Sequence, residues 1–94
     1  ENTIITNSDF LASNLGNNDF RNIDFSGVNL KKSFLHNSNL SGTNLSGINL
    51  SEASLVNTNL TNTNLTNSDL LGTIILYSNF ENSILNCIHN SICK

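Results

Sequence analysis

The chain has 94 residues, of which 12% are charged and 37% hydrophobic, and its formal net charge at pH 7 is −3. This length predicts one domain, residues 1–94, with a modest core. No basic stretch indicates a nucleic-acid or membrane-surface partner, and no apolar run approaches the roughly 18–20 residues of a membrane helix.

An apolar residue recurs at every fifth position through most of the chain. We call these the central residues (position 0) and number the other positions of each repeat −2, −1, +1 and +2 relative to them. The series is Ile5, Phe10, Leu15, Phe20, Phe25, Leu30, Leu35, Leu40, Leu45, Leu50, Leu55, Leu60, Leu65, Leu70, Ile75, Phe80 and Leu85. An unbroken short period is typical of a repeat architecture, here over about residues 3–85.

The other positions of the repeat follow a regular order. In the sixteen repeats centred from Phe10 to Leu85, position −2 is small or β-branched except at Asn18, position −1 is Asn or Asp in twelve, and position +2 is Asn or Gly in eleven. Positions −2 and 0 lie on one side of an extended segment, and Asn or Gly tolerates the left-handed backbone of a tight turn. Each repeat therefore predicts a very short strand and a corner.

This pattern resembles the pentapeptide-repeat family, whose repeat is A(D/N)LXX. Clear copies begin at Thr43, Thr58 and Ser68, and Ser or Thr commonly replaces the Ala. The resemblance implies an all-β fold, a right-handed quadrilateral β-helix in which four repeats make one coil. About four coils are then expected.

With four repeats per coil, central residues twenty apart stack in four columns. We name the four sides by these columns: face A holds Phe10, Leu30, Leu50 and Leu70; face B holds Leu15, Leu35, Leu55 and Ile75; face C holds Phe20, Leu40, Leu60 and Phe80; face D holds Phe25, Leu45, Leu65 and Leu85. We expect hydroxyls at position −2 to bond backbone groups. Outward columns such as Asn39, Asn59 and Asn79 are expected to bond amide to amide between coils.

The last residues depart from the period of five. Ile84, Ile88 and Ile92 have the spacing of successive helical turns, so we expect a C-terminal cap over about residues 84–94, formed by a short helix; a frayed β-coil is the alternative. Cys87 and Cys93 are six residues apart and could close a small loop through a disulfide. Two free thiols are the alternative.

Residues that could carry chemistry are few. Cys87, His89 and Cys93 offer three zinc ligands, whereas a structural zinc site needs four, so we expect no metal. His36 has no nucleophile or carboxylate in a recognisable catalytic arrangement. We therefore predict no catalytic residue, no cofactor and no enzymatic activity.

One face breaks the polar rule at its outward positions. On face B, Phe34, Ser54 and Ile74 stand at position −1, where the other faces carry mainly Asn or Asp. A contiguous apolar patch usually marks a contact, and a lateral helix covering it is the alternative to a biological partner. The predicted interface comprises Phe34, Val56, Leu71, Ile74, Leu76 and Tyr77.

These features predict a non-enzymatic protein-binding or scaffold module. The coil would be a rigid rod, and face B would contact a protein partner or a second copy of the chain, with no nucleic acid and no membrane involved. The chain contains no Met, so we expect a processed protein or an excised domain, either cytoplasmic or exported after removal of a signal sequence.

The resemblance also implies an alternative function. Some pentapeptide-repeat proteins resemble B-form DNA in shape and charge and bind type II topoisomerases, which protects or inhibits gyrase. Such mimicry needs dense negative charge, because DNA carries about one charge per 1.7 Å of its axis. In this chain no column has acids in successive coils: Asp9 and Asp69 are separated by Asn29 and Asn49.

Overall fold

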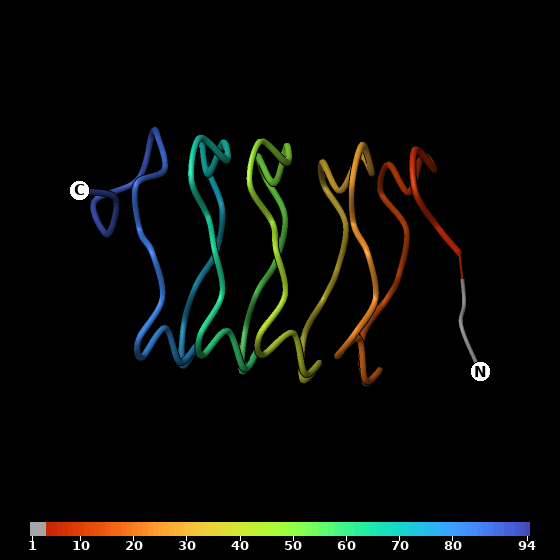
Figure 1. The fold of residues 1–94 in the computed structure, drawn as a ribbon, viewed down its shortest axis with the longest axis horizontal. Helices are drawn as coiled ribbons and strands as arrows, with labels where there is room; N and C mark the ends of the chain where they lie inside the picture. Colours follow the sequence, from red (N-terminus) through yellow and green to blue (C-terminus); the bar gives the residue numbers. More distant parts are fainter. Residues whose placement is uncertain (1–3) are drawn as a thin grey trace.

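Parallel bridges join residues twenty apart on all four faces of the stack. The computed structural model describes residues 4–94, which form successive coils stacked along the long axis of the molecule (Figure 1), with extents of 35 × 24 × 21 Å. Asn44 bridges Asn64 on face D, and Ser54 bridges Ile74 on face B. Each bridge involves a single residue at position −1, so the described chain has no longer strand. The four-sided coil is confirmed.

The corners are turns of one kind. At most corners the carbonyl of the central residue accepts a hydrogen bond from the N–H three residues later, as in the bond from the Thr43 N–H to the Leu40 carbonyl at 3.2 Å. At two corners the N–H groups of Asn18 and Thr63 donate instead to the hydroxyls of Ser38 and Ser83. Position +2 has a positive φ in every repeat from Asn7 to Asn82. This is the requirement of a type II turn at its third residue, and it explains why Asn and Gly dominate that position.

The central residues form the core. From Phe25 to Leu70, each is at most 1% exposed, because coils lie on both sides of it. Leu45 and Leu65 stack inside as expected, while Asn44 and Asn64 point outward. Each buried Leu contributes roughly 1.5–3 kcal/mol.

Buried hydroxyls at position −2 bond backbone carbonyls by two routes. The Thr43 Oγ1 donates to the Leu40 carbonyl of its own turn at 2.7 Å. The Thr58 Oγ1 donates instead to the Leu35 carbonyl of the preceding coil at 2.9 Å. Within residues 4–94, no buried side-chain nitrogen or oxygen lacks a partner. The polar interior therefore carries no desolvation penalty from unpaired groups.

The outward Asn and Asp side chains cap their own turns. At all twelve such −1 positions, Oδ1 accepts a hydrogen bond from the N–H at position +1, as from Ser46 to Asn44 and from Thr61 to Asn59, both at 3.0 Å. The expected ladder of amides is wrong: among these twelve side chains only Asn29 donates its amide to a neighbouring coil, to Asp9 at 3.1 Å. The local bond prevails because that N–H has no partner in another coil.

The expected capping helix is also wrong. Ile84 bridges Asn64 and Ile88 bridges Asp69, so both continue the coil at outward −1 positions. They are four residues apart because the repeat centred on Leu85 lacks a +2 residue, so Cys87 takes the next inward −2 position and is 7% exposed. A shortened corner, rather than a helical turn, produced the spacing. Within residues 4–94, no helix has the length and apolarity to cross a membrane.

Candidate protein-binding surface

Face B exposes apolar side chains at the position that elsewhere caps the turn. Phe34, Ser54 and Ile74 form one bridged column, and Phe34 and Ile74 are 50% and 49% exposed. Neither can accept the local hydrogen bond, and in the described chain no bond forms from the N–H of His36 or Leu76. The Val56 N–H likewise forms no bond to Ser54 in the described chain. The face therefore gives up three turn caps and presents apolar surface to solvent.

The remaining predicted interface residues lie mostly in the last full coil. Leu71 and Leu76 are 54% and 61% exposed on the two corners that border face B, and Tyr77 is 81% exposed. Val56 is half-buried one coil earlier. The structure thus places Leu71, Ile74, Leu76 and Tyr77 within one seven-residue stretch, whereas Phe34 lies two coils away with Ser54 between.

Exposed apolar residues also occur beyond the predicted set. Ile84 on face D and Ile88 over face A are 53% and 44% exposed. Of the nine exposed large apolar residues in the described chain, six therefore lie between residues 71 and 88, and Ile4, Leu11 and Phe34 lie nearer the other end. The sequence carried this signal at Ile84, which also breaks the Asn or Asp rule at position −1.

Backbone strain gathers around the same face. At position +2, the residues other than Asn and Gly are Ala12, Lys32, Glu52 and Tyr77, and all four have φ between 59° and 61°. The first three lie on the corner between faces A and B, and Tyr77 lies on the corner between faces B and C. A side chain other than Asn is unfavourable in this conformation. Both borders of face B therefore carry residues that the turn alone would not select.

Near the N-terminal end of face B, a histidine side chain covers the backbone of the preceding coil. The His36 ring lies over Gly16, because a Cβ added to Gly16 would come within 2.4 Å of the ring Cε1. A larger residue at position 16 would force the ring away. His36 is therefore a surface residue packed against Gly16. In the described chain its ring has no nucleophile or carboxylate as a hydrogen-bond partner.

Two acids of the described chain are paired with cations. Arg21 donates to Asp19 at 2.7 Å, and this hydrogen bond lowers the pKa of the Asp19 carboxyl to about 2. Lys32 Nζ lies 3.8 Å from Glu52 Oε1. Such pairs divide the negative charge of the rod into small, partly neutralised clusters.

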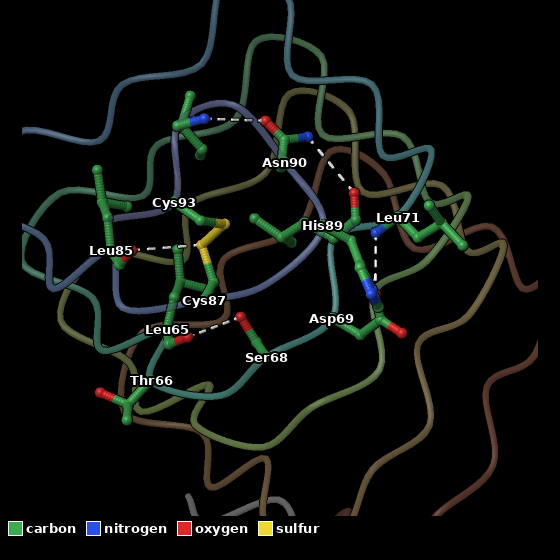
Figure 2. The surroundings of a disulfide bond; sticks show 12 residues. Leu65, Thr66, Ser68, Asp69, Leu71, Leu85, Cys87, His89, Asn90 and Cys93 are labelled. Carbon is green, nitrogen blue, oxygen red and sulfur yellow. Dashed lines mark hydrogen bonds and ion pairs between the residues drawn. A yellow bond between two sulfur atoms is a disulfide. The ribbon is translucent and has the colours of Figure 1, made fainter.

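The C-terminal tail is tied to the end of the stack. Figure 2 shows the disulfide between Cys87 and Cys93, with Cα atoms 4.9 Å apart, beside Ser68 and Leu85. The Lys94 N–H donates to the Leu85 carbonyl at 2.7 Å. With both sulfurs bonded to each other, the three-ligand zinc set considered from the sequence is not available.

His89 joins the tail to the preceding coil. Its Nδ1 lies 2.9 Å from Asp69 Oδ1 (Figure 2), and the carboxylate can only accept, so Nδ1 carries the proton. The hydrogen bond from His89, followed by that from the Leu71 N–H, lowers the pKa of the Asp69 carboxyl below its usual value. His89 thus acts as a clamp on the tail.

Comparison with known proteins identifies a family and several similar structures. A family model described as a pentapeptide repeat region matches residues 13–89. Comparison with curated proteins gives no match. Among solved structures, a pentapeptide repeat protein from Nostoc PCC 7120 is similar, with a TM-score of 0.79 and 26% identity over 84% of this chain.

Two further structures are similar. A pentapeptide repeat protein from the Arabidopsis thaliana thylakoid lumen has a TM-score of 0.56 and 25% identity over 94% of this chain. One from the cyanobacterium Cyanothece 51142 has a TM-score of 0.63 and 28% identity over 90%. The chain spans 65%, 66% and 63% of the lengths of these three structures, in the order given.

Proposed function

This chain belongs to the pentapeptide-repeat family, and we propose that it is a non-enzymatic protein-binding or scaffold module whose contact surface is face B. The surface consists of Phe34, Val56, Leu71, Ile74, Leu76 and Tyr77. The rod supplies rigidity, because backbone hydrogen bonds join each coil to the next.

One observation carries this proposal: departures from the repeat rule converge on face B. Two of them replace turn-capping residues by Phe34 and Ile74, and four others place strained side chains on the corners that border the face. Each departure costs local stability, and strain tends to persist at functional positions. Aromatic residues within such a patch are common energetic anchors of interfaces.

DNA mimicry is less favoured by the same geometry. Asp19, Glu52 and Asp69 each lie within 4 Å of a cationic or protonatable partner. A continuous negative stripe of the kind that DNA carries would require unpaired acids in successive coils.

The test is the double variant Phe34→Asn with Ile74→Asn. Both changes restore the family consensus and supply the missing acceptors for the N–H groups of His36 and Leu76, so the free energy of unfolding should be unchanged or slightly raised. Self-association, measured by sedimentation, or binding of a partner isolated from the native host should be lost.

Ile84→Asn is the matched control. It makes the same chemical change at the same repeat position on the opposite face, where Ile84 is 53% exposed. The parent and the control should show the same assembly mass in sedimentation and bind the same partners. The double variant should sediment as a monomer or fail to bind those partners. Equal mass and equal partners for all three proteins would contradict the proposal.

A further inference from the structure

The C-terminal end of the stack is only half covered. Over faces D and A the tail adds a further layer: the Asn67 N–H donates to the Asn86 carbonyl at 2.8 Å, and the Leu70 N–H donates to the Ile88 carbonyl at 3.0 Å. Leu70 is accordingly fully buried. Over faces B and C nothing in residues 4–94 adds such a layer, and Ile75 and Phe80 remain half-buried at the inner edge.

The uncovered half presents a row of free backbone groups. In the coil below, the N–H groups of Leu55, Asn57 and Leu60 donate to carbonyls of the last coil at 2.7, 3.0 and 2.8 Å. The equivalent N–H groups of the last coil belong to Ile75, Tyr77, Phe80 and Asn82, and the unused carbonyls belong to Thr73 and Ser78. Within the described chain none of these six groups has a hydrogen-bond partner. Such an edge is a template for another extended chain.

Apolar side chains surround this edge. Ile75 and Phe80 form its floor and pack against the core. Leu76 and Tyr77 follow Ile75 at the corner between faces B and C, and both are strongly exposed. A strand laid on the edge would therefore gain hydrogen bonds and apolar contacts together.

Residues 84–94 add no backbone hydrogen bond to the uncovered half. The shortened repeat and the bond from Cys87 to Cys93 turn the chain back, so that Lys94 lies against Leu85 on face D. The tail also projects beyond the last coil (Figure 1). This projection would hold the rigid end of a second copy away from the edge, whereas a single extended segment can lie beside it.

We propose that this edge binds one extended segment of a partner protein by strand addition, completing the coil over faces B and C. The inference rests on the proposed function for the apolar side chains of face B, and it goes further in naming the kind of partner. Main-chain bonds would supply affinity and alternate side chains would supply specificity.

The geometry defines the segment's chemistry. It runs parallel to residues 73–82, and over two faces it spans ten residues with one turn between them. Its inward residues must be apolar over Ile75 and Phe80 and small at the two −2 positions. A charged inward residue would be buried without a partner and would prevent binding.

A peptide with the sequence of residues 53–62 is a suitable probe, because that segment forms the same two faces one coil earlier. Added to the 94-residue chain labelled with nitrogen-15, it should slow amide hydrogen exchange at Ile75, Tyr77, Phe80 and Asn82. Exchange proceeds from the free state, so filling about nine-tenths of the sites should slow it about tenfold. The amides of Leu55 and Asn57, already bonded, serve as internal references.

The control peptide is methylated at the backbone nitrogens of Ser54 and Asn59, which would donate to the carbonyls of Thr73 and Ser78. It keeps every side chain and should not protect the four amides. Protection by both peptides alike, or by neither, would overturn strand addition. Protection that grows with protein concentration in the absence of peptide would identify a second copy as the occupant and would also overturn it.

The double variant Phe34→Asn with Ile74→Asn separates this inference from the proposed function. Phe80 and Asn82 lie on face C, so the parent peptide should still protect their amides in that variant. If the double variant keeps its partners while these amides become protected, the edge binds a strand and the face B proposal fails. If the variant loses its partners and the parent chain shows no protection, face B stands and strand addition fails.

Discussion

The middle coils and the last coil follow one repeat rule with different results. Between Phe25 and Leu70, every central residue is at most 1% exposed, whereas Ile75, Phe80 and Leu85 are half-buried. The residues are of the same kind, so burial in this fold comes from having a coil on each side. The last coil has only a half-layer above it and exposes apolar side chains outward as well. Stability should therefore be highest in the middle, and binding capacity highest at the end.

The largest expected effect is in the core of the middle coils. Leu50→Ala should lower the free energy of unfolding by about 2–5 kcal/mol, and Ile75→Ala by only about 1–2 kcal/mol, because solvent can enter the space at the open end. Urea denaturation of both variants measures the difference, with the exposed Ser46→Ala as a silent control. Equal losses at Leu50 and Ile75 would remove the contrast between the two regions.

Ser51 is unsuitable as that control. It occupies an outward +1 position, yet it is only 6% exposed, and its hydroxyl donates to Asn49 Oδ1 at 2.6 Å. Its replacement by Ala would therefore remove a hydrogen bond, and position in the repeat alone does not predict the effect.

Opening the disulfide should have the next largest effect. The bond closes a short loop, so Cys87→Ala with Cys93→Ala should lower the free energy of unfolding by about 2 kcal/mol. Amide exchange should rise at Leu70, whose N–H bonds the tail at Ile88, and should stay constant at Leu45 in the middle of the stack.

Mass spectrometry provides an independent check of the same bond. Without reductant, the intact chain should be two hydrogens lighter than its reduced form. Ready alkylation of both thiols in untreated protein would contradict the bond and leave the tail held only by hydrogen bonds.

The smallest expected effect is a dependence of the tail clamp on pH. The pKa of Asp69 is lowered in the folded chain by His89, so its contribution is present above the unfolded pKa of about 3.9 and is lost as pH falls through the lower folded value. Below about pH 4, the stability of the last coil should therefore decline.

Asp69→Asn should remove this acid-dependent decline at the tail and leave the middle coils unaffected. Amide exchange of Leu70 measured between about pH 5 and pH 2.5, corrected for its intrinsic pH dependence, provides the measurement. The same acid response in variant and parent would show that the Asp69–His89 pair does not hold the tail.

The regular part of the fold could be predicted from the sequence because its period encodes burial directly. Leu45 and Leu65 lie inside and stacked as expected. The role of Asn and Asp at position −1 was assigned incorrectly, since their spacing is equally compatible with bonds between coils and bonds within a turn. The choice depends on which N–H lacks a partner, and that becomes visible only when the backbone bonds of the coil are known.

The end of the coil was harder to predict. Ile84 and Ile88 are four residues apart either in a helix or around a shortened corner, and the chain continues for too few residues to distinguish the two patterns. A continued five-residue count would put Cys87 at an outward +2 position, yet it lies inside because one residue is missing before it. The apolar set on face B was recognisable, whereas the open backbone edge beside it has no sequence signature.

The missing residue at the last corner has a consequence for modular engineering. Because the +2 residue is absent, every later residue moves forward by one position in the repeat. The polar His89 therefore stands where a central apolar residue would be needed, and the regular coil does not continue. The deletion works as a stop signal that is separate from the repeats before it. Inserting twenty residues upstream would lengthen the rod by one coil with the stop and the faces unchanged, whereas inserting five would rotate the tail by a quarter turn relative to the earlier coils.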